Sequence, residues 1–571
     1  MLKSTQPPPP GHADRTVTIP PHIGDNVLPN LPFFDKLVRY AHREPPRIAI
    51  RDLNAVVGKS YLQLLTDALA LRRVLRDSLG HSTREKLDND EEVFIALIAP
   101  GGYEYAMAFI ATLALGAAVV PITPALPVEE AKSLVLRARC VAIISSISCT
   151  DLARNVGASI SRTPGGNIIP HLTASHHLQP KPLQPHDIVI SSNKVPNMNA
   201  AALVIFTSGT TGPPKGAVQR RSYITGAAED VADHYRITES DTVLHMLPVH
   251  HATGIGVTFI PFLVSGACVE FRSGSFDPAW TWDRWRRGGL TFFSGVPTIY
   301  TRIMRHFETI IAVLSHEKQM GYLNGARSLR VLLCGTSALP SPVQEFWTKI
   351  LAGKPILTRY GGTEFHTVLK ADLEHGKTPA TSVGRISPGV SLKLNDEGMI
   401  LVKGPHMFSK YLHDEPATTA AHDADGYFIT GDIARREGDN YFILGRASVD
   451  IIKSGGYKLS ALDIEREMLG LEYISEVMVV GVDDDEYGQR VAAAVTLKDG
   501  HGGLSLGNLR QDLKERLARY KMPTILRVLD GEIPKTGTGK VQKKILGPRY
   551  FPSDYRMSPD VQIWERGKAK L

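Results

Sequence analysis

The feature that most constrains this fold is a buried strand that runs directly into a loop of glycines, hydroxyls and one lysine. Ala201 to Ile205 is a short apolar run of the kind that forms a strand inside a sheet. The chain continues as Phe-Thr-Ser-Gly-Thr-Thr-Gly-Pro-Pro-Lys-Gly, with the lysine at position 215. Glycines let the backbone turn tightly, and hydroxyls, N–H groups and an ammonium hold phosphate oxygens. Because Gly216 follows Lys215, the Walker pattern is excluded. The stretch predicts a phosphate-binding loop, with a surface Gly/Thr turn as the alternative.

The size of the chain calls for more than one domain, since 571 residues exceed what one hydrophobic core usually supports. The net charge of +7 is small and the basic residues are scattered, so composition does not indicate nucleic-acid binding. The cysteines form no C-x-x-C pair and lie in apolar runs, which is typical of reduced core residues in an intracellular protein. They are Cys140, Cys149, Cys268 and Cys334. No run reaches the roughly 18 apolar residues of a membrane span.

Strand-like and helix-like runs alternate along the first four hundred residues. Val93–Ala99 predicts a strand, Tyr103–Leu115 a helix and Ala117–Pro121 the next strand, a rhythm that favours a parallel α/β sheet. A segment rich in Pro, Ser, Asn and His interrupts it at about 160–200. We expect four parts: a disordered Pro-rich tail (1–30), a large domain (31–446), a small α+β domain (447–550) and a C-terminal tail (551–571).

Histidines gather in the interrupting segment, at His171, His176, His177 and His186. A histidine cluster can bind metal, but here no cysteine and no helical i, i+4 pair accompanies it. The sequence therefore favours a solvated linker over a metal site.

Further motifs follow downstream in a fixed order. Thr358–Glu364 places a hydroxyl and a carboxylate at a tight turn, which suits a phosphate and its magnesium ion. Tyr427–Asp432 ends in a carboxylate that can accept from both ribose hydroxyls. Leu444–Arg446 and Pro534–Lys540, which reads Pro-Lys-Thr-Gly-Thr-Gly-Lys, complete the set. Each motif alone is consistent with an ordinary turn, but their order and combination are not.

With these motifs, residues 30 to about 550 resemble the adenylate-forming superfamily of acyl-CoA synthetases, nonribosomal adenylation domains and luciferases. Ser448–Lys458 and Gly295–Arg302 are similar to malonyl-CoA synthetases of the acyl-CoA synthetase family member 3 type. The resemblance implies an α/β fold in which a large N-terminal domain of stacked sheets carries a small, mobile α+β C-terminal domain. It also implies an ATP-dependent acid–thiol ligase, in which a carboxylate attacks ATP to give acyl-AMP and coenzyme A then displaces AMP.

The resemblance assigns nucleotide contacts to the matching positions. These are Thr207, Ser208, Gly209, Thr210, Thr211, Gly212, Lys215, Gly335, Tyr360, Gly361, Thr363, Asp432, Arg446 and Lys540. In this assignment Lys215 and the hydroxyl loop hold the β- and γ-phosphates, Thr363 contacts the α-phosphate, and Asp432 accepts from the ribose. Thr211 and Glu364 are the implied magnesium ligands.

The implied catalytic residues are Lys540, Lys453, His251 and Glu364. Lys540 would serve the first step by bridging the ribose and the carboxylate. The C-terminal domain would then rotate about a hinge near 448–450, so that the segment starting at Lys453 serves the second step. His251 would lie at the substrate carboxylate, with a core histidine satisfied by backbone as the alternative.

The implied substrate residues are His251, Arg302 and Gly362. A second carboxylate, as in malonate, calls for an arginine partner, and Arg302 is the candidate by position. The alternative for Arg302 is a surface arginine on the helix that starts at Pro297. Malonate-type enzymes tend to carry His where this chain has Thr253 and Met where it has Gly362, which predicts a roomier and less cationic pocket. An aromatic, heteroaromatic or short to medium acyl acid therefore stays open beside malonate.

An alternative of a different class is a stand-alone adenylation enzyme that loads a carrier protein. That activity is usually accompanied by an attached helical carrier domain, and only about twenty residues follow position 550. A luciferase-like oxygenase would need no additional motif, so only base rate disfavours it.

The last three residues, Ala569–Leu571, resemble the Ser-Lys-Leu peroxisomal address. We expect a peroxisomal enzyme whose partners are a small carboxylic acid, ATP, CoA and the peroxisomal import receptor, with no nucleic acid and no membrane span. Cytoplasm and mitochondrion are the alternative locations.

Overall fold

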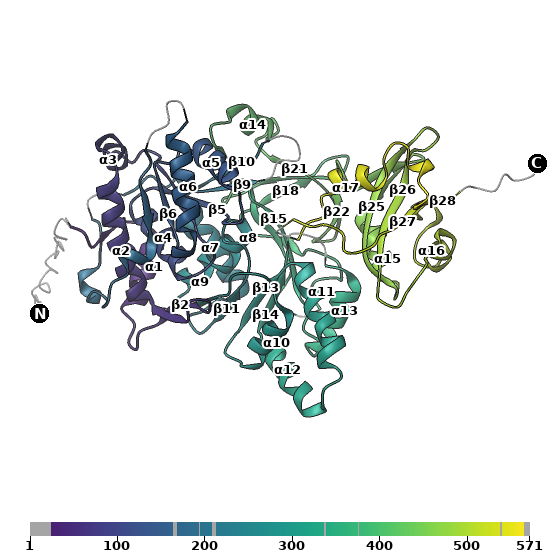
Figure 1. Cartoon of the computed structure of the whole chain (residues 1–571), viewed down its shortest axis with the longest axis horizontal. Coiled ribbons are helices and arrows are strands. Elements are labelled where there is room, and N and C mark those ends of the chain that lie inside the picture. Colours follow the sequence, from purple (N-terminus) through teal and green to yellow (C-terminus); the bar gives the residue numbers. More distant parts are fainter. Residues whose placement is uncertain are drawn as a thin grey trace, which may run out of the picture.

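The structure is a computed structural model that describes residues 24–163, 168–192, 195–207, 213–335, 339–374, 376–536 and 539–564. Figure 1 shows a large body that holds the N-terminal elements and a smaller body formed by the last elements of the chain. The predicted fold class is confirmed: the protein is α/β, with a large N-terminal domain and a small C-terminal domain.

The first sheet has the strand order β20-β10-β9-β5-β4-β6-β7, and every residue of β4 and β5 is buried. Its strands are β4 (Phe94–Ile98), β5 (Ala118–Ile122), β6 (Ala142–Ser145), β7 (His171–Thr173), β9 (Ala201–Thr207), β10 (Lys215–Arg220) and β20 (Lys410–Tyr411). Its covering helices are α2 (Tyr61–Ser78), α4 (Tyr103–Ala114), α5 (Val128–Arg137) and α6 (Thr150–Ser161). Ile95 and Leu97 of β4 pack in one core with α2 and α4, whereas Ala96 and Ile98 pack in another with α5 and α6. Both faces are covered, which is why these strands read as continuous apolar runs.

The second sheet has the order β17-β16-β15-β14-β13-β11-β12-β2-β3 and stacks on the first. Its strands are β2 (Ile48–Asp52), β3 (Val57–Ser60), β11 (Thr242–His245), β12 (Cys268–Phe271), β13 (Phe292–Gly295), β14 (Val331–Cys334), β15 (Leu357–Gly362), β16 (His366–Lys370) and β17 (Arg385–Ile386). Val243 and Phe292 share a core with Leu97 of the first sheet. On the opposite face, Leu244 and Phe293 pack against α10 (Pro278–Arg286), α11 (Pro297–His306), α12 (His316–Ser328) and α13 (Ser341–Ile350).

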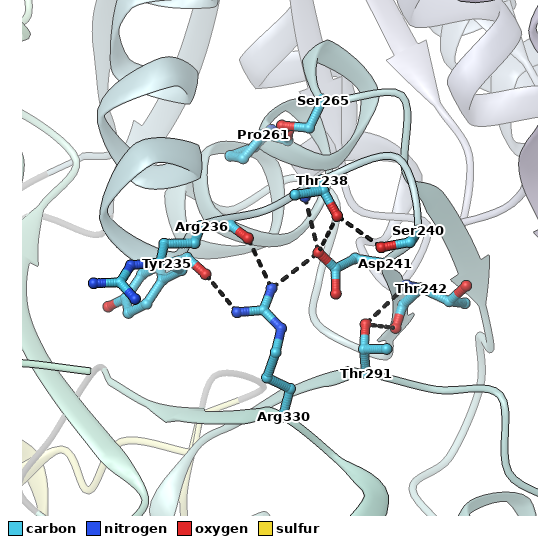
Figure 2. Close-up of polar contacts among 10 residues, drawn as sticks. All are labelled: Tyr235, Arg236, Thr238, Ser240, Asp241, Thr242, Pro261, Ser265, Thr291 and Arg330. Carbon is cyan, nitrogen blue, oxygen red and sulfur yellow. Dashed lines mark hydrogen bonds and ion pairs between the residues drawn. The ribbon is translucent and has the colours of Figure 1, made fainter. Parts of the chain in front are cut away.

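A single arginine ties the second sheet to the helix between the sheets, α7 (Arg221–Tyr235) (Figure 2). Arg330 donates to the carbonyl oxygens of Tyr235 and Arg236 at 2.9 Å each and to Oδ2 of Asp241 at 2.9 Å. Its guanidinium also lies over the ring of Phe292 at 4.6 Å. Because Arg236 leaves the helix in the left-handed region (φ 51°), these bonds satisfy carbonyls that the helix end leaves free. The arginine thereby fixes the end of α7 against β11 and β14.

Smaller elements complete the large domain. A four-stranded sheet, β18-β19-β21-β22, leads to the domain junction. It comprises β18 (Ser391–Leu394), β19 (Met399–Lys403), β21 (Phe428–Glu437) and β22 (Asn440–Arg446). The other elements are α1 (Pro32–Ala41), α3 (His81–Asp88), α8 (Ala252–Thr258), α9 (Ile260–Val264) and α14 (Glu415–Ala420).

The C-terminal domain has a sheet and cores of its own. It contains β23 (Ile451–Ser454), β24 (Tyr457–Ser460), α15 (Ala461–Leu469), β25 (Ile474–Asp484), β26 (Gly488–Leu497), α16 (Leu506–Asp512), β27 (Ile525–Val528), α17 (Lys543–Tyr550) and β28 (Val561–Ile563). Its two buried clusters draw only on residues 452–561. Separate cores are what allow one domain to move as a unit against another.

Three expectations about the irregular parts of the chain need correction. Val27 and Leu28 form β1, which pairs with β8 (Val189–Ile190), so order begins before residue 31. The segment at 160–200 is more than a linker, since β7 extends the first sheet. Within the expected C-terminal tail, β28 pairs with β27 because it satisfies the free edge of that strand. Residues 1–23 and 565–571, including the Ala-Lys-Leu end, lie outside the described residues. Among the described helices, none has the length and apolar character needed to cross a membrane.

Candidate active site

The predicted phosphate-binding loop connects two antiparallel strands. Thr207 ends β9 and Lys215 begins β10, and the two residues face each other in register. The Thr207 hydroxyl donates to the carbonyl oxygen of Lys215 at 3.3 Å. The five residues between these anchors that were expected to contact ATP lie outside the described residues. They are Ser208, Gly209, Thr210, Thr211 and Gly212.

Tyr411 brings the loop lysine and the predicted magnesium ligand together. Its hydroxyl donates to Oε1 of Glu364 at 2.9 Å, and the Lys215 ammonium lies over its ring at 5.1 Å. Desolvation and the nearby Glu364 carboxylate raise the pKa of Tyr411 above its ordinary range, so the hydroxyl keeps its proton as a donor. Sequence reasoning missed Tyr411, because β20 carries no motif. Thr363, beside Glu364, accepts a 2.6 Å hydrogen bond at its carbonyl from the Gln219 side chain.

The predicted ribose site forms around Asp432. Arg446 lies opposite it in the β21–β22 register, and the Arg446 Nε is 2.9 Å from Oδ1 of Asp432. The Tyr360 hydroxyl donates to Oδ2 at 2.7 Å, and the Asp432 backbone N–H donates to Oγ1 of Thr430 at 3.0 Å. Desolvation raises the pKa of Asp432, and Arg446, Tyr360 and Lys540 act against that rise. The carboxylate is thus buried, oriented and held by donors on both oxygens.

Lys540 of the C-terminal domain lies close to this group. Desolvation and the nearby Arg446 lower the pKa of Lys540, whereas Asp432 and Glu364 raise it. The Lys540 N–H donates to Oγ1 of Thr536 at 3.1 Å, and the Gly539 N–H donates to the Thr536 carbonyl at 2.8 Å. The structure therefore brings the predicted first-step lysine to the predicted nucleotide residues.

His251 is the N-cap residue of α8 and directly precedes Ala252. Its Nδ1 accepts from the Thr253 N–H at 3.4 Å, which leaves the Nε2 proton free to donate. Desolvation, then Lys540 and His250, lower the pKa of His251 to about 4. The imidazole is therefore neutral near pH 7 and can act there as a hydrogen-bond donor but not as a cation.

Two glycines of the site lie so close to neighbouring atoms that a side chain at either position would collide with them. A Cβ on Gly361 would meet the carbonyl oxygen of His366 at 2.1 Å, so only glycine fits there. A Cβ on Gly362 would lie 2.5 Å from the ring of Phe365, which is 5% exposed. The expectation that Gly362 leaves a roomier pocket is wrong on the side that faces Phe365, because the Phe365 ring fills that space.

Arg359 is a further residue that sequence reasoning did not single out. It is 8% exposed, and among the described residues neither its Nη1 nor its Nη2 has a hydrogen-bond partner. Its guanidinium carbon would lie 3.1 Å from a Cβ on Gly335, so the absence of a side chain at Gly335 makes room for it. A buried cation on the strand that carries Tyr360 gives this side of the site a positive charge.

Two further predicted residues make contacts with residues outside this group. Arg302, on α11, is half-exposed and pairs with Glu532 of the C-terminal domain, with 3.5 Å between Nη2 and Oε2. Lys453 is exposed on the β23–β24 hairpin, and its backbone N–H donates to Oε1 of Gln489 at 2.9 Å. Their predicted roles therefore stay predictions.

Comparison with known proteins identifies the family. A model of the AMP-binding enzyme family matches residues 37–412, and a model of the AMP-binding enzyme C-terminal domain matches residues 463–540. The chain belongs to the AMP-binding enzyme family. Arg446 lies between the two matched segments, and Lys540 is the last residue of the second.

Relatives of this AMP-binding enzyme are CoA ligases by name. The chain is 30% identical to the acyl-CoA ligase oryP of Aspergillus oryzae, over 94% of this chain and 96% of the relative. It is 32% identical to the mitochondrial malonate–CoA ligase ACSF3 of Xenopus laevis, over 86% and 88% of the two chains. The crystal structure of ATP-bound MatB from Rhodopseudomonas palustris matches with a TM-score of 0.75 and 25% identity, covering 93% of this chain and all of that one. The expected likeness to malonyl-CoA synthetases and the expected class of acid–thiol ligase are confirmed.

Proposed function

We propose that this AMP-binding enzyme joins a small carboxylic acid, with malonate as the first candidate, to coenzyme A. The observation that carries the proposal is that Asp432 contacts Tyr360 and Arg446, while Tyr411 contacts both Glu364 and Lys215, so residues of separate predicted motifs are joined. The names of relatives such as the Xenopus malonate–CoA ligase support malonate. The relative oryP is named without an acid, so the acid is a question for experiment.

In the first step, an oxygen of the acid carboxylate attacks the α-phosphorus of ATP, giving acyl-AMP and pyrophosphate. Asp432, held by Tyr360 and Arg446, accepts from the ribose hydroxyls and fixes the nucleotide. Lys540 offsets the charge that develops between the carboxylate and the phosphate, and Lys215 holds the outer phosphates. His251, whose Nδ1 accepts from the Thr253 N–H, donates a hydrogen bond from its Nε2–H to the substrate carboxylate.

The residues present fit a magnesium ion that is held largely by substrate. Magnesium usually takes one or two protein carboxylates together with substrate phosphates. Glu364 supplies such a carboxylate, with Oε1 fixed by Tyr411. No group of three or more His, Cys, Asp or Glu side chains within the described ranges forms a metal site on its own. When bound, the ion would offset negative charge on the phosphate oxygens.

In the second step, the thiol of coenzyme A attacks the acyl carbonyl and AMP leaves. We infer that the C-terminal domain rotates between the steps, about a hinge near residues 448–450, to present the hairpin that carries Lys453. The exposure of Lys453 outside the nucleotide site agrees with a role that begins only after this rotation. The domain division near residue 446 belongs to the same proposal.

The first experiment measures AMP release by purified protein with ATP, magnesium and CoA across malonate, methylmalonate, acetate, hexanoate, benzoate and nicotinate. We expect malonate to give the highest kcat/KM. A clear preference for a monocarboxylate would overturn the malonate assignment and favour Thr253 as the specificity signal.

The Lys540→Ala variant tests the reaction class. Acid-dependent ATP–pyrophosphate exchange should fall by at least about a hundredfold, because the developing charge loses its counter-ion. Lys544→Ala, a matched change at an exposed lysine four residues away, should leave exchange intact. Undiminished exchange in Lys540→Ala would contradict the proposed first step.

We also propose a peroxisomal location, supported by the Ala-Lys-Leu end of the sequence. The ACSF3 relatives are named as mitochondrial, so mitochondrion and cytoplasm are the competing outcomes. An N-terminally tagged chain should co-localise with peroxisomes, and deleting residues 569–571 should release it. A full-length chain found in mitochondria or spread through the cytosol would overturn the proposal.

A further inference from the structure

Three of the four histidines of the interrupting segment line one cavity. His171 lies on β7, the last strand of the first sheet, and His176 and His177 lie on the 3₁₀ helix that follows it, Ala174–His177. The cavity has a volume of about 480 Å³, and the three imidazoles are among its lining groups, whereas His186 is not. The fold therefore gathers histidines that were expected in a solvated linker at the edge of the first sheet.

This cavity is separate from the active site. Its other lining residues come from the end of α2, from the residue that leads into β7 and from the first turns of α6. Figure 1 shows α2 and α6 on the side of the large domain that is turned away from the C-terminal domain. Among the described residues, those that line the cavity include none of the predicted nucleotide, catalytic or acid-binding residues. A molecule bound here would therefore be held in addition to the substrates.

The cavity gathers cationic and hydrogen-bonding groups without an acid to balance them. Arg154 contributes a guanidinium from α6, beside the three imidazoles. Within the described ranges, no Asp or Glu side chain lines the cavity. Arg154 pairs with Asp151 at 3.2 Å, but the two side chains are 68% and 90% exposed, so water competes with their pairing. The guanidinium is therefore available to an anion that enters the cavity.

The pKa values of two of these histidines reflect the missing counter-charge. Desolvation, then Arg154 and His176, lower the pKa of His171, and desolvation, then His176, lower the pKa of His177. The carboxylate of Glu104, on α4, interacts with His176, but Glu104 does not line the cavity. A bound anion would favour the protonated imidazoles and oppose these shifts.

Two of the polar groups at the cavity are held in place by their neighbours. Nε2 of His171 lies 2.9 Å from Oγ of Ser145, which orients the imidazole ring. The hydroxyls of Thr150 and Thr173, both at the cavity, lie 3.3 Å apart, and Thr173 is 6% exposed. Polar groups that are fixed before a ligand arrives lose less conformational entropy when it binds.

We propose that this cavity is a second binding site, which takes an organic molecule that carries a phosphate group. The phosphate would be held by Arg154 and the imidazoles of His171, His176 and His177. The site does not depend on which acid the enzyme activates, so it goes beyond the proposed function.

The chemistry of the lining favours a phosphate over the other candidate ligands. A phosphate monoester carries close to two negative charges and three acceptor oxygens, whereas a carboxylate offers one charge and two oxygens to the same set of donors. The described part of the chain has no group of three or more His, Cys, Asp or Glu side chains suited to a metal. Val74, Pro170 and Leu172 give the cavity an apolar part, and its volume lies within the range of about 300–1,000 Å³ that small-molecule sites have. These features call for an organic group attached to the phosphate.

Protection of the histidines from chemical modification tests the location of the site. The full chain is treated with diethyl pyrocarbonate, with and without millimolar phenyl phosphate at constant ionic strength, and modified histidines are assigned by mass spectrometry. We expect phenyl phosphate to slow modification of His176 and His177 at least several-fold. His186, which is 80% exposed and lies outside the cavity, is the internal control and should react at the same rate throughout.

Benzoate, a carboxylate on the same ring, tests the class of ligand. We expect it to protect His176 and His177 several-fold less than phenyl phosphate at the same concentration. Equal protection by benzoate would overturn the assignment to a phosphate. Absence of protection by phenyl phosphate would overturn the site itself.

Calorimetric titration of phenyl phosphate into side-chain variants gives a second test. Arg154→Gln and His176→Gln change exposed side chains, and each should weaken binding several-fold, with a larger loss in the double variant. Arg137→Gln, at an exposed arginine on α5 outside the cavity, and His186→Gln are the matched controls and should bind as the parent does. Parental affinity in the double variant would overturn the proposal.

The same variants separate this site from the active site. Without phenyl phosphate, acid-dependent ATP–pyrophosphate exchange in Arg154→Gln and His176→Gln should match the parent, because neither side chain belongs to the nucleotide site. A parallel loss of exchange and of phenyl phosphate binding, at an unchanged Tm, would show that the cavity is not a separate site and would overturn the proposal.

Discussion

The hydroxyl of Tyr411 donates a 2.9 Å hydrogen bond to Oε1 of Glu364, and this pairing orients the carboxylate that we propose to hold magnesium. Tyr411 is 9% exposed, and a phenylalanine in its place removes this donor from Oε1. A hydrogen bond to a charged group contributes about 1.5–3 kcal/mol. Tyr411→Phe should therefore lower kcat/KM by about tenfold or more. It should also raise the magnesium concentration needed for half-maximal AMP release.

Tyr473→Phe is the control for that change. Tyr473 also donates to a carboxylate, Asp512, at 2.7 Å, but within the C-terminal domain. Its loss should leave the magnesium dependence unchanged. If Tyr411→Phe and Tyr473→Phe behave alike, the Tyr411–Glu364 pair has no role in metal binding.

The sequence predicted the parts of this site whose signal is local. The run Val93–Ala99 predicts β4 because a strand that is buried on both faces has apolar residues at every position. Asp432 could be singled out because a carboxylate after a glycine at a strand end suits ribose hydroxyls, whereas the role of Lys540 was implied by the resemblance of its motif to the adenylate-forming superfamily. Each of these inferences needed only a few neighbouring residues.

What the sequence could not predict depends on contacts between distant segments. Tyr411 is 47 residues from its partner Glu364, and no local pattern marks such a pair. Phe365 fills the space beside Gly362 only because Tyr360 and Phe428 hold its ring. Likewise, the partner of Arg302 is set by how two domains meet.

Gly362→Met tests whether the pocket accepts the residue that malonate-type enzymes tend to carry. The Phe365 ring lies 2.5 Å from the position of the new Cβ and is held by aromatic neighbours, so it cannot move aside freely. Overpacking of this kind costs about 1–3 kcal/mol. We expect a lower Tm, and recovery when Phe365→Leu is added. Gly58→Met, at a glycine with open space around it, should change Tm little, and an equal loss at both positions would refute the packing argument.

Acid should destabilise the protein through its buried histidines. His245 is 1% exposed, and desolvation lowers its pKa to about 3. Its unfolded pKa is about 6.5, so below that pH the unfolded chain binds a proton that the folded chain does not. Stability is therefore fully present above about pH 6.5 and falls as the pH drops towards 3. The loss at pH 5 is about 2 kcal/mol for this residue.

Urea unfolding at about pH 7 and pH 5 measures this loss. His245→Gln should unfold more easily at neutral pH but lose less stability on acidification than the parent. His186→Gln, at a histidine that is 80% exposed, should keep the parental pH dependence. An unchanged pH dependence in His245→Gln would show that another group titrates instead.

A buried lysine holds the start of the C-terminal domain to the helix that follows the catalytic loop. Lys543 Nζ lies 2.6 Å from Oδ1 of Asp450 and 2.7 Å from Oε1 of Glu465, and its side chain is 10% exposed. Burial opposes its charge, yet the carboxylates of Glu465 and Asp450 raise the pKa of Lys543 above its ordinary value, so it stays protonated. Asp450 also accepts the Arg446 N–H at 2.9 Å, which extends the network to the domain junction.

Lys543→Met would leave two carboxylates buried without their cation. Breaking a buried ion pair on one side costs about 3–5 kcal/mol, and we expect the C-terminal domain to unfold at a lower temperature than the large domain in calorimetry. Lys544→Met removes a neighbouring exposed lysine and should leave the transition in place. Adding Glu465→Gln should recover part of the loss, because it removes one of the two uncompensated charges. If the double variant is as unstable as Lys543→Met alone, the cost arises from lost packing of the lysine stem and not from the unpaired carboxylates.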